Sequence, residues 1–192
     1  MMLETEIKLS ITDLADALLR VQSIGARVFK ERYFEDNFVF DNGTQTLQKN
    51  KMLLRVRMVG ARHASPLDQS CILTFKGTPD YSRGVKDREE IECEVSDPDR
   101  LIQILSRLGF SIFFRYQKYR TIYTIDSVSL EICIDETPIG NYFELEGELK
   151  SIQEYANRLG YSPQQYITES YSSLYSRWRR ENQRESVHMM FE

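Results

Sequence analysis

The chain has 192 residues, of which 41% are hydrophobic and 28% are charged, so one soluble domain with a single sizeable core is expected. It has no apolar run near the ~18 residues that a membrane span needs, and its net charge of −4 argues against a general nucleic-acid binder. With only two histidines and three cysteines, a zinc site, a Ser-His-Asp triad or a disulfide framework is not expected. The few cysteines and the acidic start Met1-Met2-Leu3-Glu4, which is unlike a secretory signal, predict a cytoplasmic protein.

Four amphipathic helices are predicted from apolar periodicity and from the residues that can begin and end a helix. Their ranges are 12–23, 96–108, 151–159 and about 162–180. Thr12 is the expected N-cap of the first, and Ser96 or Asp97 that of the second. Residues 181–192 are expected to be a disordered tail, which leaves residues 1–180 as one domain.

A weak internal repeat accompanies this pattern. An offset of 84 residues places Gly25 on Gly109, Phe29 on Phe113, and the first predicted helix on the second. A predicted strand precedes the helix in each half. The repeat therefore indicates one domain built from two similar halves around a pseudo-twofold axis.

Seven predicted strands alternate charged and apolar side chains, so that each has one charged face and one apolar face. In any single strand, the charged face could simply be the side that is exposed to water. The four helices, however, need the apolar strand faces as packing partners, which turns the charged faces toward the inside of a closed sheet. The charged residues on these faces are Glu4, Glu6, Lys8, Arg55, Arg57, Lys76, Arg88, Glu90, Glu92, Lys118, Arg120, Glu131, Asp135, Glu144 and Glu146.

The composition of this interior indicates its ligands. Carboxylates without thiolate or imidazole suit a hard divalent cation such as Mg²⁺ or Mn²⁺. Arginine and lysine side chains suit phosphate, and the number of cations exceeds what a monophosphate needs. The strands thus predict a site for a polyanion such as a triphosphate, held together with a metal ion.

The same residues resemble the motifs of the CYTH, or triphosphate tunnel metalloenzyme, superfamily, in that family's order and over about residues 3–176. The resemblance implies an α+β fold, namely a closed eight-stranded antiparallel β-barrel with a charged lumen that is coated by helices. The motifs are Glu4-Thr-Glu6-Ile-Lys8, Leu54-Arg-Val-Arg57, Leu73-Thr-Phe-Lys76-Gly77, Arg88-Glu-Glu90-Ile-Glu92, Gln117-Lys118-Tyr-Arg120 and Gly140-Asn-Tyr-Phe-Glu144-Leu-Glu146.

The resemblance also implies roles for these side chains. Metal ligation is expected of Glu4, Glu6, Asp135, Glu144 and Glu146. Phosphate binding is expected of Lys8, Arg55, Arg57, Lys76, Arg88, Lys118 and Arg120. Among these cations, Lys8, Arg57 and Lys76 are expected to be catalytic by stabilising charge in the transition state.

Membership of such a family leaves the reaction open. The favoured hypothesis is hydrolysis of the terminal phosphoanhydride, as in inorganic or thiamine triphosphatases. A class IV adenylyl cyclase, which converts ATP to cAMP and pyrophosphate, is the second interpretation, because Tyr116-Gln-Lys-Tyr-Arg-Thr-Ile-Tyr123 and Glu169-Ser-Tyr-Ser-Ser-Leu174 resemble that branch. The third is a module that binds polyphosphate or a nucleotide without turning it over.

The expected partner is therefore a small triphosphate: tripolyphosphate, thiamine triphosphate or ATP. The strand faces named above carry no aromatic side chain on which a base could stack, so discrimination is expected to rest on the phosphate chain. The alternative is that Tyr166, Tyr171 or Tyr175 of the last predicted helix folds over one mouth of the tunnel and provides a base contact. The sequence leaves the oligomeric state open, including a homodimer.

Overall fold

The computed structural model describes residues 2–62 and 70–192, and all elements and contacts below belong to these residues. The strands are β1 (Met2–Ile11), β2 (Arg27–Asn42), β3 (Leu53–Gly60), β4 (Ser70–Lys76), β5 (Lys86–Glu94), β6 (Phe110–Thr124), β7 (Leu130–Thr137) and β8 (Gly140–Gly147). The α-helices are α1 (Leu14–Ser23), α2 (Thr46–Lys49), α3 (Pro98–Arg107), α4 (Leu149–Arg158) and α5 (Tyr171–Glu181).

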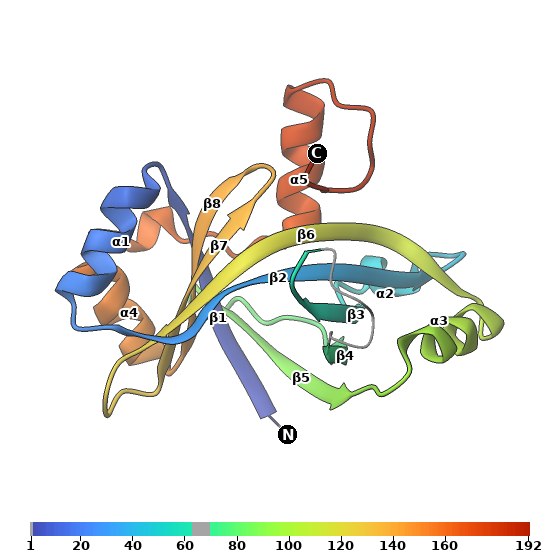
Figure 1. Cartoon of the computed structure of the whole chain (residues 1–192), viewed down its shortest axis with the longest axis horizontal. Helices are drawn as coiled ribbons and strands as arrows, with labels where there is room; N and C mark the ends of the chain where they lie inside the picture. The colour runs from blue at the N-terminus through green and yellow to red at the C-terminus, as the bar shows by residue number, and fades with distance from the viewer. Residues whose placement is uncertain (1, 63–69) are drawn as a thin grey trace.

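The strands close into an antiparallel barrel in the order β1-β5-β4-β3-β2-β6-β7-β8, which confirms the predicted fold (Figure 1). The two longest strands, β2 and β6, pair with each other along most of their length. Alternate side chains of each strand point into the closed sheet and away from it. The barrel thereby separates a charged interior from apolar outer surfaces.

The order of the strands confirms the pseudo-twofold arrangement of two halves. Each half has a strand, a helix and three further strands: β1, α1, β2, β3 and β4 in the first, and β5, α3, β6, β7 and β8 in the second. The short helix α2 is an addition to the first half, between β2 and β3. Exchanging the halves reproduces the same closed ring in reverse. The halves meet where β1 pairs with β5 and β2 with β6, and again at β4–β5 and β1–β8.

Helices cover the outside of the barrel in three places, and each contact buries an apolar core. Helices α1 and α4 lie together at one end (Figure 1). There Val21 and Ile152 are fully buried in the same core as Phe143 of β8. At the opposite end, Leu105 of α3 packs with Phe40 of β2. The third core lies between α5 and β6.

Two helix boundaries differ from the sequence prediction. Asp13 rather than Thr12 caps α1, because its carboxylate accepts hydrogen bonds from two backbone N–H groups of the first turn. The predicted helix 162–180 begins only at Tyr171. The predicted start forms only a 3-10 turn, Pro163–Gln165. Beyond Glu6, β1 has no partner from β5, and the backbone of Ile167 instead exchanges two hydrogen bonds with Lys8, which interrupts the helix at this point.

The C-terminal residues were expected to be a disordered tail, and the structure corrects this. Met189 is fully buried, and its backbone bonds to Arg115 and Gln117 of β6. The reason is that β7 pairs with β6 only from Tyr119 onward, which leaves earlier backbone groups of β6 free for another strand. The chain folds back from α5 to fill this gap.

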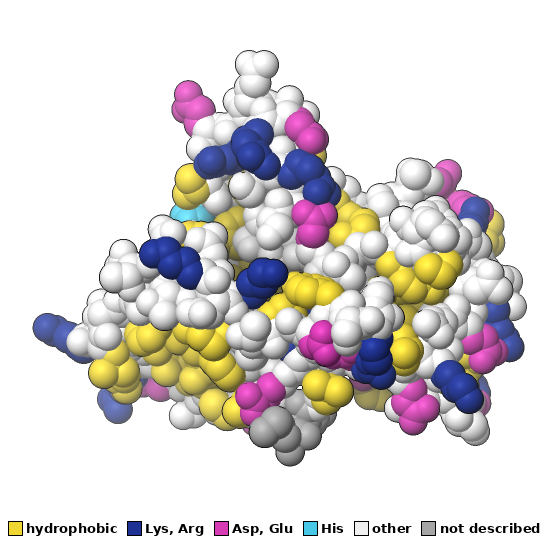
Figure 2. Space-filling model, turned by 180° about the vertical axis from the view of Figure 1, so that it is seen from behind, with side chains coloured by type: hydrophobic (Ala, Val, Ile, Leu, Met, Phe, Trp, Pro, Cys, Tyr) yellow, Lys and Arg dark blue, Asp and Glu magenta, His cyan; other side chains and the backbone are white. Residues whose placement is uncertain are grey.

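The helix α5 projects from the barrel, and Figure 2 shows Lys and Arg side chains gathered over it. Arg179 and Arg180 lie in its last turn, where positive charge interacts favourably with the negative end of the helix dipole. None of the helices in the described ranges has both the length and the apolar character that crossing a membrane requires.

Candidate active site

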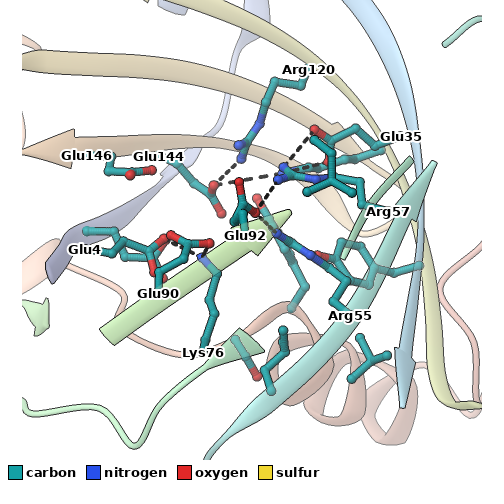
Figure 3. A pocket seen from close by; sticks show the side chains of 18 of the residues that line it. Glu4, Glu35, Arg55, Arg57, Lys76, Glu90, Glu92, Arg120, Glu144 and Glu146 are labelled. Atoms are coloured by element: carbon teal, nitrogen blue, oxygen red, sulfur yellow. Dashed lines mark hydrogen bonds and ion pairs between the residues drawn. The ribbon is translucent and has the colours of Figure 1, made fainter. Parts of the chain in front are cut away.

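The interior of the barrel holds a cavity of about 320 Å³, here called the tunnel (Figure 3). This volume lies within the range of small-molecule sites. All the cations predicted from the strand pattern line the tunnel, as do all the predicted carboxylates except Asp135. The alternation in the sequence thus identified the interior face correctly.

Asp135 pairs opposite Arg120 and so shares the interior face, but it does not line the tunnel and is fully buried beneath the residues that it binds. Its carboxylate accepts hydrogen bonds from Arg120 at 2.6 and 2.7 Å and from Lys118 at 2.8 Å. The phenolic oxygen of Tyr171 donates a further hydrogen bond at 2.7 Å. With four donors around it, this carboxylate holds the cations of β6 in place.

Glu144 and Glu6 are likewise surrounded by cations. Glu144 lies 3.2 Å from Lys8 and pairs with Arg120, while Glu6 lies 2.5 Å from Lys86. Burial opposes ionisation of both carboxyls, but the neighbouring cations outweigh it and hold the pKa of Glu6 and of Glu144 well below the usual range. Both groups are therefore charged at neutral pH.

Arg55 and Arg57 project from β3 into the tunnel, on the side opposite Glu144 in Figure 3. Arg57 contacts Glu92 at 2.9 Å and Glu35 at 3.5 Å, and Arg55 lies 3.6 Å from Glu92. The Nε atoms of both arginines are buried and find no hydrogen-bond acceptor among the described residues. A buried donor without an acceptor costs roughly 1–3 kcal/mol, so these arginines retain capacity to bind an anion.

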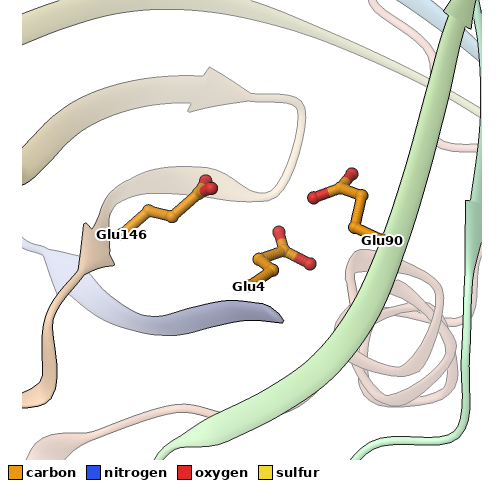
Figure 4. A group of neighbouring side chains, drawn as sticks. All are labelled: Glu4, Glu90 and Glu146. Atoms are coloured by element: carbon orange, nitrogen blue, oxygen red, sulfur yellow. The ribbon is translucent and has the colours of Figure 1, made fainter. Parts of the chain in front are cut away.

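Three carboxylates from different strands converge at one side of the tunnel: Glu4 of β1, Glu90 of β5 and Glu146 of β8 (Figure 4). One oxygen atom from each lies within 4.8 Å of the other two. We call this group the carboxylate trio. Lys76 donates to Glu4 at 2.5 Å and lies 2.9 Å from Glu90, and Arg88 donates to Glu4 at 3.1 Å, so two cations partly neutralise the trio.

The charges of the trio repel one another, and the pKa values reflect this. Burial, followed by the charge of Glu4, raises the pKa of Glu146 to about 8. Burial also raises the pKa of Glu90, with Glu4 contributing and Lys76 opposing. Because a divalent cation would relieve this repulsion, an all-oxygen group of this kind fits a hard metal ion.

The trio only partly matches the ligand set expected from the resemblance. Glu4 and Glu146 belong to both sets, and Glu90 was expected in the lumen but was not named as a ligand. The other expected ligands, Glu6, Asp135 and Glu144, lie outside the trio and contact lysine or arginine, as Glu4 also does, and their role as ligands stays a prediction. This difference depends on which strands are neighbours, which the sequence motifs do not contain.

Several tunnel residues were missed by the sequence analysis. Glu35 of β2 is fully buried between Lys118 and Arg57, and Lys86 of β5 contacts Glu6. The strand period could have identified both. Glu35 alternates with its neighbours in the series Tyr33, Glu35, Asn37 and Val39, and Lys86 stands two residues before Arg88 on the same face.

The expectation of an interior without aromatic side chains is wrong. Tyr33, Phe114, Tyr116 and Tyr171 line the tunnel together with the charged residues. Tyr116 lies on β6, where its phenolic oxygen accepts a hydrogen bond from Arg55 at 3.1 Å. Tyr171 comes from outside the barrel, at the start of α5.

Comparisons with known proteins agree with this architecture. The family model of the CYTH domain matches residues 2–171. A protein of Methanocaldococcus jannaschii named as a putative adenylate cyclase is 29% identical over 154 residues, which cover 80% of this chain and 81% of that protein.

Solved structures show the same fold at lower identity. One from Vibrio parahaemolyticus, described as a putative adenylate cyclase, has a TM-score of 0.75 at 18% identity and covers 90% of this chain and 97% of its own. A Hippeastrum protein, described as a putative adenylyl cyclase with a dominant triphosphatase activity, has a TM-score of 0.64 at 19% identity, with 91% and 96% covered.

Proposed function

The chain belongs to the CYTH domain family, and from this premise we propose that it hydrolyses the terminal phosphoanhydride of a small triphosphate, such as tripolyphosphate or thiamine triphosphate. Members of this family are metal-dependent enzymes that act on triphosphate substrates. The observation that carries the proposal is the meeting of the carboxylate trio with a set of phosphate-binding cations inside one cavity.

The proposed metal ligands are Glu4, Glu90 and Glu146, which bring three oxygen donors together and gain most from a neutralising cation. Mg²⁺ and Mn²⁺ suit such donors. When bound, a divalent cation of this kind withdraws charge from phosphate oxygens during the reaction. Glu6 and Glu144 remain candidates only if substrate draws away the cations that now surround them.

The proposed phosphate-binding residues are Lys8, Arg55, Arg57, Lys76, Arg88, Lys118 and Arg120. The unsatisfied Nε–H groups of Arg55 and Arg57 support this role, because phosphate oxygens are suitable acceptors for them. Lys8, Arg57 and Lys76 are proposed to stabilise the charge that develops as the terminal phosphoryl group is transferred to water. The ion pairs that hold these cations fix their positions before substrate enters.

A second candidate reaction is the cyclisation of ATP to cAMP and pyrophosphate. It is favoured by the name of the Methanocaldococcus relative and by the Hippeastrum protein's description, which joins a cyclase name to a triphosphatase activity. Cyclisation uses the same phosphate and metal sites, but the nucleophile is the ribose 3′-hydroxyl. Hydrolysis needs only water as the nucleophile, so the tunnel does not have to position a ribose hydroxyl for attack.

Product analysis separates these reactions. The purified protein is incubated with tripolyphosphate, thiamine triphosphate or ATP, together with Mg²⁺ or Mn²⁺, and the products are separated by chromatography. Hydrolysis gives one phosphate and the matching diphosphate, which for ATP is ADP. Stoichiometric cAMP and pyrophosphate would establish the cyclase instead, and tight binding without any product would indicate a binding module.

A further inference from the structure

Arg55 differs from the other proposed phosphate-binding cations in the groups that hold it. Each of the other six has a carboxylate oxygen within 3.2 Å: Lys8, Arg57, Lys76, Arg88, Lys118 and Arg120. For Arg55, the nearest carboxylate oxygen among the described residues belongs to Glu92 and lies 3.6 Å away. In the described part of the chain, Arg55 is thus the one cation of the seven that has no carboxylate at hydrogen-bond distance.

Two neutral hydroxyl groups hold Arg55 instead. Its Nη1 donates to the phenolic oxygen of Tyr116 at 3.1 Å, and its Nη2 donates to the hydroxyl of Thr74 at 3.2 Å. A hydroxyl group fixes the direction of a guanidinium without cancelling its charge, whereas a carboxylate does both. Arg55 is therefore held in one orientation and keeps its attraction for an anion.

The two hydroxyl groups differ in their remaining hydrogen-bonding capacity. Thr74 is fully buried, does not line the tunnel and donates its own proton to Glu92 at 2.6 Å. Tyr116 lines the tunnel, and its O–H group has no acceptor among the described residues. A phenolic hydroxyl can accept one hydrogen bond and donate another at the same time. The Tyr116 hydroxyl can therefore still donate a hydrogen bond to a ligand.

Packing fixes the Tyr116 ring before a ligand enters. The ring stacks on Phe114 with centroids 5.6 Å apart and contacts the Tyr171 ring at 5.7 Å. Met189 of the C-terminal segment is fully buried, pairs with the backbone of Tyr116 and belongs to the same apolar core. A donor that is already held in place loses little conformational freedom on binding. Tyr116 is therefore preorganised to contact a ligand in the tunnel.

We propose that Tyr116 is a further substrate-binding residue, which donates its O–H to a phosphate oxygen while it accepts the hydrogen bond that orients Arg55. The buried Nε–H of Arg55, which lacks an acceptor in the described part of the chain, supplies a second donor to the same phosphate chain. Thr74 is a positioning residue, because it acts only through Arg55. This inference rests on the proposed function and deepens it by adding a neutral donor to a site built mainly from charges.

Tyr116→Phe tests the proposal, because it removes only the hydroxyl and keeps the packed ring. Calorimetry should show a Kd for tripolyphosphate that is about tenfold higher, as for loss of a hydrogen bond to a charged group, and KM should rise with it. Binding of Mn²⁺ should be unchanged, since neither Tyr116 nor Arg55 belongs to the carboxylate trio. Tyr142→Phe is the matched control, because Tyr142 packs on Tyr171 at 5.7 Å but does not line the tunnel.

A double-mutant cycle separates direct contact from positioning. In the Arg55→Ala background, Thr74→Val should have no further effect on the Kd for tripolyphosphate. Tyr116→Phe should still raise this Kd there, but by a smaller factor than in wild type. An undiminished effect of Thr74→Val in that background would overturn its positioning role, and complete loss of the Tyr116→Phe effect would overturn the direct contact.

The outcomes also separate this inference from the proposed reaction. Equal Kd values for wild type and Tyr116→Phe, or equal losses of tripolyphosphate and Mn²⁺ binding, would overturn the role of Tyr116. If no triphosphate is hydrolysed but Tyr116→Phe still weakens tripolyphosphate binding selectively, the proposed reaction fails and the role of Tyr116 stands. If Tyr116→Phe does not fold, Thr74→Val decides, and unchanged affinity in that variant would overturn the support of Arg55 by hydroxyl groups.

Discussion

The phenolic oxygen of Tyr171, the first residue of α5, lies 2.7 Å from Oδ2 of Asp135 in β7. The Tyr171 ring lies 5.3 Å from the ammonium of Lys8 and 5.4 Å from that of Lys118. A helix outside the barrel thus contacts the side chains that position the tunnel cations. A movement of α5 would therefore change the contacts of Tyr171 with Asp135 and with these cations.

Tyr171→Phe should destabilise the fold by roughly 1.5–3 kcal/mol, the range for a hydrogen bond to a charged group. The measurement is the free energy of unfolding from urea titrations. Tyr166→Phe is the control, because Tyr166 makes no side-chain hydrogen bond within the described chain. Equal stability of wild type and Tyr171→Phe would mean that Lys118 and Arg120 alone satisfy Asp135.

Glu146→Gln should weaken binding of Mn²⁺ by more than the 10–100-fold that loss of a supporting residue costs, since it removes a proposed direct ligand. The fold should survive, because the pKa of Glu146 is raised to about 8, so its carboxyl is largely neutral at pH 7 without metal and glutamine matches that state. Calorimetry with Mn²⁺ measures the affinity. Glu131→Gln is the matched control, as Glu131 lines the tunnel outside the trio. Parallel losses in the two variants would assign the effect to general charge rather than to ligation.

Arg57→Lys keeps the charge but removes the fork of donors that can grip two phosphate oxygens. We expect tripolyphosphate to bind about tenfold more weakly, equivalent to about 1.4 kcal/mol. Arg32→Lys is the control, because Arg32 forms a comparable two-point contact with Glu136 on the outside of the barrel. Unchanged calorimetric affinity in Arg57→Lys would show that this arginine serves only as a partner for Glu35 and Glu92.

Stability should fall in acid because of Glu35. Burial opposes its ionisation, but the charges of Lys118 and Arg57 prevail and lower the pKa of Glu35 far below its usual value. The unfolded chain then binds more protons than the folded protein, so the free energy of unfolding decreases as pH falls below the unfolded pKa of ~4.3.

Glu35→Gln should remove this part of the acid sensitivity. The variant starts less stable at pH 7, by up to roughly 3–5 kcal/mol, because two buried cations lose a partner. Its stability then declines less steeply than that of wild type between pH 5 and pH 2. Urea titrations across this interval measure the difference, and parallel curves would contradict the assigned pKa shift.

Met189→Ala should destabilise the protein by about 2–5 kcal/mol, as for other fully buried methionines. Met189 packs with Tyr116 and Tyr175 and is fully inaccessible, whereas Met190 is only partly buried. Met190→Ala should therefore cost less in the same thermal unfolding experiment. Equal behaviour of the two variants would place the C-terminal segment away from the core.

The interior face of the barrel could be predicted because the period of a strand is short and local. Glu4, Glu6 and Lys8 must share a face in any extended chain, and apolar neighbours must share the other. The trio could not be predicted in this way. Glu4, Glu90 and Glu146 meet because β5 and β8 flank β1 on opposite sides at a particular register, which long-range pairing decides.

The parts of the site that come from outside the barrel were the least predictable. Tyr171 enters the tunnel because Ile167 pairs with the backbone of Lys8 and delays the start of α5, a contact between residues distant in sequence. The polar composition of residues 181–192 suggested disorder, yet one methionine and the free backbone of β6 suffice to order the segment. Composition cannot reveal an available strand edge elsewhere in the fold.

The pseudo-twofold barrel also raises the question of direction. A symmetric ring offers an elongated ligand two equivalent ways to enter, whereas the additions to this ring are one-sided. The segment from α4 to the C-terminus follows only the second half, and it places Ser170, Tyr171 and Ser172 in the lining of the tunnel. The C-terminal extension therefore makes the two ends of the tunnel different, so that the two ends of a bound chain of phosphates are no longer interchangeable.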